Sequence, residues 1–320
     1  MRGHESPLAE GRFTSQPQLS SASKCLMRFG LTTPVVTLVP RTHAAWEVDA
    51  GPDELRQIAQ AADRLGYHHL TCSEHVGIPR EVAAIRGGRY YDPAATLGFL
   101  AAVTQRVRLL THVLVLPYHH PLEVAKRYGT LDRLSGGRVI IGVGVGSLKE
   151  EFELLGTDFA GRGARYEDAL RALRAALGQR DPEYHGAHYD FAGFIIDPCA
   201  VQARVPIWIG GRSARSLRRA LEFGDGWDPF GFSVGQFEDL LARARDWPQW
   251  RRRSEPFDIV LSPEPAVALD DAGAVEQARE LVARFQHMGA TALNLRFRHR
   301  SLAHYLELLD RFAREVMPFT

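Results

Sequence analysis

The segment 107–152, VRLLTHVLVLPYHHPLEVAKRYGTLDRLSGGRVIIGVGVGSLKEEF, decides the fold of this chain. Two apolar runs in it, 107–116 and 138–145, have the length and composition of buried strands, and they flank one helix-length stretch. The second run ends in GVGVG at 142–146, with glycines at alternate positions. Because alternate residues share one face of a strand, that face should lack side chains, and a flat or anionic ligand could then contact the backbone. The segment therefore predicts a βαβ unit that borders a cofactor site.

Composition limits the class of protein. The 320 residues include 39 basic and 38 acidic side chains, and a net charge of +1 argues against a nucleic-acid partner. No apolar run is long enough to span a bilayer and no signal-peptide pattern is present, so we expect no membrane partner. Cys25, Cys72 and Cys199 are far apart and form no CxxC pair. They predict neither a disulfide framework nor a zinc site, and they favour a reducing, cytoplasmic location.

Residues 1–26 differ from the rest of the chain. Gly, Ser, Gln and Pro dominate there, and no apolar periodicity is present. We predict a disordered N-terminal extension, which an early start codon would explain, followed by one domain over 27–320. Glu5 and Glu10 argue against a targeting peptide, because such peptides are poor in acidic residues.

After Met27 the chain alternates short apolar runs with amphipathic helical segments. The pattern predicts eight strand-then-helix units, with strands at 29–33, 69–73, 107–116, 139–143, 206–209, 227–230, 257–261 and 292–297. A hairpin insertion around Gly186-Ala187 is expected after the helix that follows the fourth strand.

Eight right-handed βα units close most naturally into an α/β (β/α)8 TIM barrel. The competing architecture is an open doubly wound sheet, which usually carries a GxGxxG turn after its first strand. Here that turn reads Thr32-Thr33-Pro34, so the barrel is favoured. In such a barrel the chemistry lies at the carboxyl ends of the strands.

Three stretches together resemble the luciferase-like monooxygenase superfamily: THVLVLPYHHPLEVAKRYGTLDRLS, GGRVIIGVGVGSLKEEFELLG and PIWIGGRSARSLRRALEFGDGW. The resemblance extends over 28–319 and is closest to the branch that uses the deazaflavin coenzyme F-420. It implies a barrel with an insertion region, and a flavin or deazaflavin lying across the carboxyl ends of the strands.

Glu74 and His75 close the second predicted strand and are the candidate catalytic pair. A histidine titrates near neutral pH and therefore suits proton transfer. From the residues alone, a hydrogen-bonded structural histidine at the start of a loop is an equal alternative. The family resemblance favours function, because it implies that such a pair faces the cofactor ring.

The resemblance also implies the cofactor-binding residues. His112 and Val113 occupy the place where the family often has a non-proline cis peptide behind the ring, and Gly144 and Gly146 would approach it closely. At 210–213, GGRS joins a strand to a helix. There Gly210, Gly211, Arg212 and Ser213 could bind a phosphate through backbone N–H groups, a hydroxyl and a guanidinium, while Ser213 could also serve as the helix N-cap.

Substrate contacts are expected from Ser147, His119 and Phe230. The resemblance places residue 147 near the substrate, and some deazaflavin-dependent sugar dehydrogenases have a catalytic Glu there, so Ser147 argues against that activity. The aromatic residues near Phe230 suggest an apolar or ring-bearing molecule. His119 and His120 lack the partners that a metal site needs, so none is expected.

We therefore expect an oxidoreductase that transfers hydride between coenzyme F-420 and a small organic substrate. One alternative is a monooxygenase that uses flavin mononucleotide (FMN) and a separate flavin reductase. A second alternative is a flavin-binding barrel without catalysis, against which the retained Glu74-His75 pair argues. Family analogy further implies a homodimer.

Overall fold

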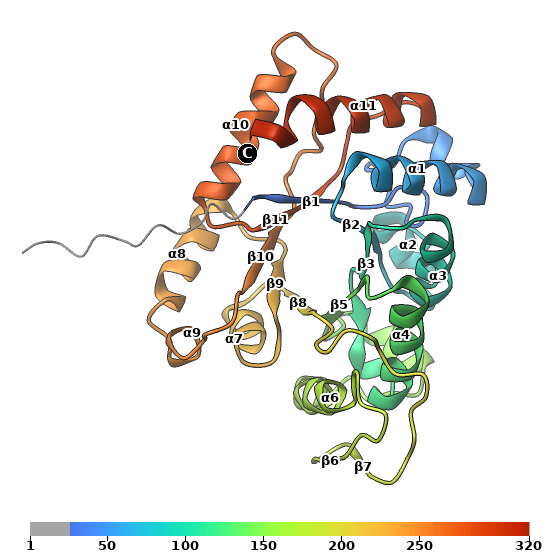
Figure 1. Ribbon diagram of the computed structural model, residues 1–320, viewed down its shortest axis with the longest axis vertical. Coiled ribbons are helices and arrows are strands. Elements are labelled where there is room, and N and C mark those ends of the chain that lie inside the picture. The colour runs from blue at the N-terminus through green and yellow to red at the C-terminus, as the bar shows by residue number, and fades with distance from the viewer. Residues whose placement is uncertain (1–25, 320) are drawn as a thin grey trace, which may run out of the picture.

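A computed structural model describes residues 26–319, which form a closed parallel barrel (Figure 1). Its strands are β1 (Arg28–Leu31), β2 (His69–Cys72), β3 (Arg108–Thr111), β5 (Val139–Gly144), β8 (Ile207–Gly211), β9 (Gly226–Pro229), β10 (Asp258–Leu261) and β11 (Ala292–Leu295). Hydrogen bonds join them in the order β3-β2-β1-β11-β10-β9-β8-β5, and pairing of β3 with β5 closes the ring. The prediction of a TIM barrel is confirmed.

Eight helices of ten or more residues surround these strands in Figure 1. They are α1 (Pro52–Leu65), α3 (Pro93–Val103), α4 (Pro121–Ser135), α6 (Arg162–Ala176), α7 (Ala214–Phe223), α8 (Val234–Ala244), α10 (Ala274–His287) and α11 (Leu302–Glu315). Proline stands at the first position of α1 and α4, where its missing N–H costs nothing. Gly66 and Gly136 end these two helices with φ of 82° and 69°. No helix within 26–319 is both long and apolar enough to cross a membrane.

Short helices in the connections were not predicted. They are α2 (Arg80–Arg86), α5 (Lys149–Leu154), α9 (Pro248–Arg251), and the 3-10 turns η1 (Ala45–Val48), η2 (Leu116–Tyr118) and η3 (Met317–Phe319). With three to seven residues each, they span at most two turns, too few for an apolar repeat to be recognised.

The predicted hairpin insertion is confirmed. Strands β6 (Tyr184–His185) and β7 (Asp190–Phe191) pair antiparallel after α6, and Figure 1 shows them beside that helix, away from the barrel. Asp168 of α6 anchors the hairpin, because its carboxylate accepts hydrogen bonds from the Tyr184 hydroxyl (2.5 Å) and the His188 N–H (2.7 Å).

The third strand is not the continuous run that the sequence predicted. Strand β3 stops at Thr111, the His112–Val113 peptide bond is cis, and the short strand β4 (Leu114–Val115) then pairs only with β5. Two side chains that follow β2 hold this break. The Ser73 hydroxyl donates to the His112 carbonyl (2.7 Å), and the Glu74 carboxylate accepts from the Val115 N–H (2.6 Å).

The alternate glycines of 142–146 serve a purpose that the sequence did not indicate. A Cβ on Gly144 would lie 2.7 Å from Val113 Cγ2, and one on Gly146 would lie 2.6 Å from the Phe152 ring. Neighbouring side chains therefore fill the face that the glycines leave bare. The missing side chains make room for the broken third strand. Gly144 and Gly146 still border a cavity at the strand ends, so contact of a ligand with their backbone stays a prediction.

Replacing Gly144 by Ala tests this packing. Because the new methyl group would overlap Val113, either the side chain or the strand must move, and overpacking of this kind costs about 1–3 kcal/mol. We expect the free energy of unfolding, measured by urea titration, to fall by that amount. The double variant Gly144→Ala, Val113→Ala should regain part of the loss.

Gly98→Ala inside α3 is the matched control. A Cβ there meets no atom within 4 Å, and alanine favours a helix by about 1 kcal/mol over glycine. The control should leave stability unchanged or raise it. Equal effects of the two single substitutions would contradict the proposed packing.

Candidate active site

One cavity at the carboxyl ends of the barrel strands, with a volume of about 610 Å³, gathers most of the predicted site residues. They are Glu74, His75, His112, Val113, Gly144, Gly146, Ser147, Gly210, Gly211, Arg212, Ser213 and Phe230. His119 does not line this cavity. The walls also include residues that the sequence did not single out, among them Tyr118, Tyr166, Arg162 and Arg219.

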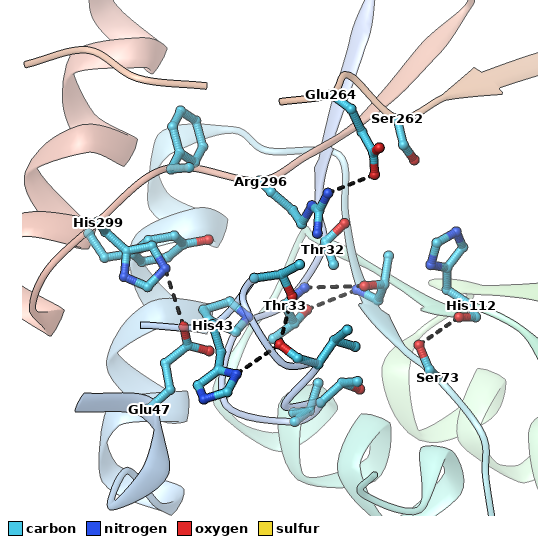
Figure 2. Close-up of a pocket in the computed structure, with 18 of the residues that line it drawn as sticks. Thr32, Thr33, His43, Glu47, Ser73, His112, Ser262, Glu264, Arg296 and His299 are labelled. Carbon is cyan, nitrogen blue, oxygen red and sulfur yellow. Dashed lines mark hydrogen bonds and ion pairs between the residues drawn. The ribbon is translucent and has the colours of Figure 1, made fainter. Parts of the chain in front are cut away.

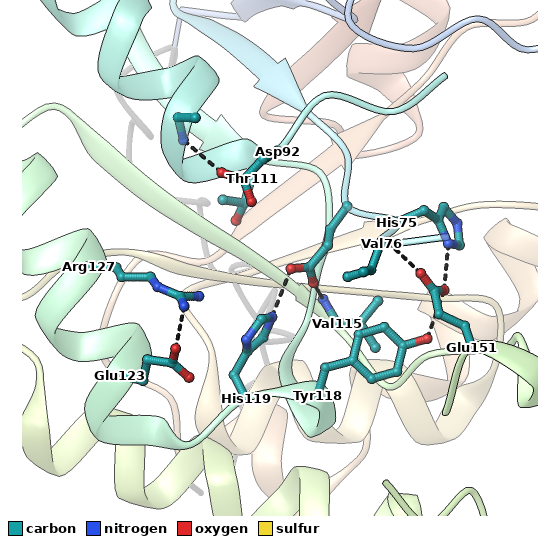
Figure 3. A network of polar contacts seen from close by, with 12 residues as sticks. His75, Val76, Asp92, Thr111, Val115, Tyr118, His119, Glu123, Arg127 and Glu151 are labelled. Carbon is teal, nitrogen blue, oxygen red and sulfur yellow. Dashed lines mark hydrogen bonds and ion pairs between the residues drawn. The ribbon is translucent and has the colours of Figure 1, made fainter. Parts of the chain in front are cut away.

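His75 is held by a carboxylate at one ring nitrogen. Its Nδ1 contacts the Glu151 carboxylate (Figure 3), at 2.7 Å from Oε2. The ring of Tyr90 packs edge-on against His75, with 4.6 Å between the ring centroids. Since Nδ1 is engaged, Nε2 is the nitrogen that remains for exchange of a proton with a ligand.

Glu151 is the most important residue that sequence reasoning missed. Its side chain is fully buried, and besides His75 it accepts hydrogen bonds from the Tyr118 hydroxyl (2.9 Å) and the N–H groups of Val76 (2.6 Å) and Gly77 (3.2 Å). Burial alone would raise the pKa of Glu151, but these hydrogen bonds and the charge of His75 outweigh burial and lower it. Glu151 therefore stays ionised and orients His75.

Glu74 follows β2 and lines the cavity, but both of its carboxylate oxygens are already engaged. The Val115 N–H and His119 Nε2 (2.8 Å) donate to these two oxygens, and only 6% of the Glu74 side chain is exposed. The geometry thus makes Glu74 a positioning residue for β4 and His119 rather than a free acid. His119 in turn lies behind the cavity wall, so the contact expected between it and a substrate has no support.

His112 forms a second histidine–carboxylate pair. Its Nε2 lies 2.9 Å from Asp228 Oδ2, and 24% of its side chain remains exposed. Burial by itself would lower the pKa of His112, but the charge of Asp228 and their hydrogen bond raise it above the ordinary value. His112 therefore binds a proton more readily than an ordinary histidine, and its Nδ1 remains for a ligand.

A row of hydrogen bonds through His68, His69 and Asn294 ends at Asp228. Asn294 Nδ2 donates to Asp228 (3.3 Å), His69 Nε2 lies 2.6 Å from Asn294 Oδ1, and His68 Nδ1 lies 2.8 Å from His69 Nδ1. Burial lowers the pKa of His69 to about 4 and that of His68 to about 2, so both rings are neutral. We assign His69 the Nε2–H tautomer, because Asn294 Oδ1 can only accept. The row stabilises the negative charge that holds His112.

The predicted anion site lies where β8 joins α7. Ser213 is the N-cap of α7: its hydroxyl accepts from the Ser216 N–H (3.3 Å), and its own N–H donates to Ser216 Oγ (3.3 Å). Arg212 is exposed, lines the cavity, and has no hydrogen bond or ion pair within residues 26–319. A free guanidinium beside the N-terminus of a helix fits a phosphate-bearing cofactor.

A metal centre has no basis in the described part of the chain. Within 26–319, no group of three or more His, Cys, Asp or Glu side chains could hold a metal ion.

The closed barrel and its strand-end cavity with two histidine–carboxylate pairs define an enzyme of the TIM-barrel class. The chain belongs to the luciferase-like monooxygenase family, whose profile matches residues 27–315. It is accordingly a flavin- or deazaflavin-dependent oxidoreductase, and the resemblance found in the sequence is confirmed.

Relatives with stated activities differ in their cofactors. The oxygenase component of a flavin-dependent trigonelline monooxygenase from Acinetobacter baylyi is 27% identical over 249 residues, which cover 76% of this chain and 67% of that protein. Monooxygenase RslO1 from Streptomyces bottropensis superposes with a TM-score of 0.75 at 22% identity, covering 91% of this chain and 99% of that one. An F-420-dependent secondary alcohol dehydrogenase superposes with a TM-score of 0.71 at 14% identity, covering 92% and 99%.

Replacing Asp228 by Asn should lower the pKa of His112, because burial then acts without an opposing charge. In the native protein the raised pKa adds stability that is complete below the unfolded value of about 6.5 and is lost as the pH rises through the folded value. The free energy of unfolding should therefore differ more between the native protein and Asp228→Asn near pH 5.5 than near pH 8.5. The change in this difference should roughly equal the free energy that corresponds to the shift in the His112 pKa.

NMR titration of the His112 ring and urea unfolding at the two pH values measure these effects. Asp190→Asn is the control, since Asp190 pairs with the exposed His185 on the hairpin and should leave the pKa of His112 unchanged. An unchanged His112 titration in Asp228→Asn would show that the pair does not set its charge.

Proposed function

We propose that this protein transfers a hydride between the deazaflavin coenzyme F-420 and a small organic substrate. The observation that carries the proposal is a second cavity of about 310 Å³ beyond Arg212. It shares Arg212 with the main cavity and continues along α8 to Arg243, with one carboxylate, Asp239, in its wall. FMN ends at its phosphate, whereas F-420 continues into a tail of carboxylates, which would lie along these two guanidinium groups.

The residues that would hold the ring surround the break after β3. Val113 packs against Gly144 and Gly210, and His112 borders the same wall with its free Nδ1. When bound, a deazaflavin supplies or accepts a hydride, because carbon replaces the nitrogen through which flavins react with oxygen. Asp228 raises the pKa of His112, and the protonated ring would stabilise negative charge on a reduced cofactor ring.

His75 is the proposed acid–base residue. When a carbonyl substrate accepts a hydride at carbon, its oxygen needs one proton, which His75 Nε2 would supply. Oxidation of the alcohol reverses both transfers. Glu151 holds the opposite ring nitrogen and so keeps Nε2 directed at the cavity.

A two-component FMN monooxygenase is the second candidate, because the trigonelline monooxygenase relative is described as flavin-dependent. The same wall at 112–113 and the same Arg212 would bind FMN, and a separate reductase would supply the reduced flavin. The cationic continuation past Arg212 would then have no ligand to bind. A barrel that binds cofactor without catalysis would leave the His75–Glu151 pair without a purpose.

Titration of the purified protein with oxidised F-420 and with FMN, followed by absorbance and fluorescence, tests the choice of cofactor. We expect F-420 to bind at least tenfold more tightly than FMN, because only F-420 reaches Arg243. Arg243→Ala should weaken F-420 binding by about tenfold, the value of one charge-assisted contact, and leave FMN binding unchanged. Tight FMN binding without F-420 binding would overturn the proposal.

Arg245→Ala is the matched control for the cofactor titration. Arg245 is a second exposed guanidinium group at the end of α8, but it does not line the cavity that contains Arg243. Equal losses of F-420 affinity in the Arg243 and Arg245 variants would indicate a general effect of charge instead of a specific contact.

His75→Asn should lower turnover by about 10²–10⁴-fold, the usual contribution of a general acid–base residue. Turnover is measured as oxidation of reduced F-420 by the most active compound in a panel of ketones, enones and quinones. Cofactor affinity should change little. His185→Asn on the exposed hairpin is the control and should keep full activity. Unimpaired turnover in His75→Asn would remove His75 from the mechanism.

A further inference from the structure

Two more cavities lie at the barrel mouth beside the cofactor cavity, and Figure 2 shows the inner one. The inner chamber, of about 310 Å³, shares Ser73, His112 and Phe230 with the cofactor cavity. The outer chamber, of about 500 Å³, adjoins it and shares further residues, including His43 and Arg296. A molecule lying in both chambers would therefore extend from His112 out to solvent.

The inner chamber suits an uncharged molecular body. Apolar side chains such as Val36 and Phe297 line it together with the hydroxyl groups of several threonines. Two hydroxyls of its lining residues, Thr37 Oγ1 and Tyr305 Oη, are buried and have no hydrogen-bond partner within 26–319. Buried polar atoms without partners are uncommon in native proteins, so they point to a missing ligand or water. Two acids line the inner chamber, and both are engaged. Glu47 is hydrogen-bonded to the N–H groups at Val35 (2.9 Å) and Ala44 (2.7 Å), and Glu264 pairs with Arg296.

The outer chamber is cationic although the whole chain is nearly neutral. Three guanidinium groups line it, those of Arg41, Arg296 and Arg298, against one carboxylate, Glu264. Arg296 pairs with Glu264 at 2.8 Å, as Figure 2 shows, but the Glu264 side chain is 75% exposed. An ion pair this exposed contributes little, and an anionic ligand can compete with it.

The other two guanidinium groups are freer still. Arg298 lies 3.7 Å from Asp271, whose side chain is 82% exposed, and that pair is also weak. Arg41 has no ion pair or hydrogen bond from its side chain within the described residues. Planar guanidinium groups match the two oxygens of a carboxylate.

We propose that these chambers bind an organic acid as the substrate, with its carboxylate on Arg296 and Arg298 and its ring or chain in the inner chamber beside His112. That the acid is the substrate rests on the proposed function. Its binding in the two chambers does not require the cofactor. Arg296 is the specificity-determining residue, because it lines both chambers and is only 30% exposed.

Calorimetry on the cofactor-free protein tests the binding of three matched pairs: benzoate with benzamide, 3-phenylpropionate with its amide, and cyclohexanecarboxylate with its amide. We expect each carboxylate to bind at least tenfold more tightly than its amide, and the binding to weaken with salt. Phenyl phosphate identifies a preference for phosphate over carboxylate. Quenching of Trp46, whose indole N–H donates to His299 at 3.0 Å in the chamber wall, provides a second signal.

Arg296→Ala should reduce carboxylate affinity by at least tenfold and leave the amides unaffected, while Arg296→Lys should retain part of the preference. Arg314→Ala, an exposed site on α11, is the control and should bind like the native protein. Undiminished cofactor affinity in Arg296→Ala would show that the variant is folded. Equal binding of acids and amides, no binding of any acid, tighter binding of phenyl phosphate, or an unaffected Arg296→Ala would each overturn the proposal. None of these outcomes bears on the cofactor titration.

Discussion

The close packing of the broken third strand against the glycine strand is the constraint on which the rest of the site depends. Val113 occupies the space that side chains at Gly144 and Gly210 would take, and the Thr111 hydroxyl donates to the Gly142 carbonyl (2.7 Å) on the same side. Protein interiors tolerate little change in volume, so three barrel strands hold the break in one position. His112 is thereby kept at the mouth of the barrel, between the cofactor cavity and the inner chamber.

Three buried carboxylates then fix the positions of the backbone and of the histidines in the site. Glu74 holds the backbone after the break, Glu151 holds His75, and Asp228 holds His112. Each carboxylate accepts two or more hydrogen bonds, which offset the cost of burying a polar group. The result is one histidine free to exchange a proton at Nε2 and another whose pKa is raised above the ordinary value.

Arginine side chains form two groups at the barrel mouth, with His112 between them. Arg212 and Arg243 lie on one side, along α7 and α8, and Arg41, Arg296 and Arg298 lie on the other. A chain of net charge +1 therefore has two separate cationic regions with the reacting centre between them. That arrangement suits an anionic cofactor tail and an anionic substrate that meet at their uncharged ends.

The sequence by itself determined the barrel, because eight apolar runs with intervening amphipathic helices have few other ways to bury their faces. It also indicated which strand ends border the cavity, since GVGVG, Glu74-His75 and GGRS all stand at the ends of apolar runs. These are local signals, readable from neighbours in the chain.

Only the tertiary structure decided how the side chains are paired. Glu151 and His75 are separated by 76 positions, Asp228 lies far along the chain from His112, and Asn294 meets His69 across 225 positions, so no local pattern links them. The same limit hid the purpose of the glycines, because what fills the space beside Gly144 comes from a different strand. Periodicity reports which face of an element is buried, whereas a site is made by the contacts between elements.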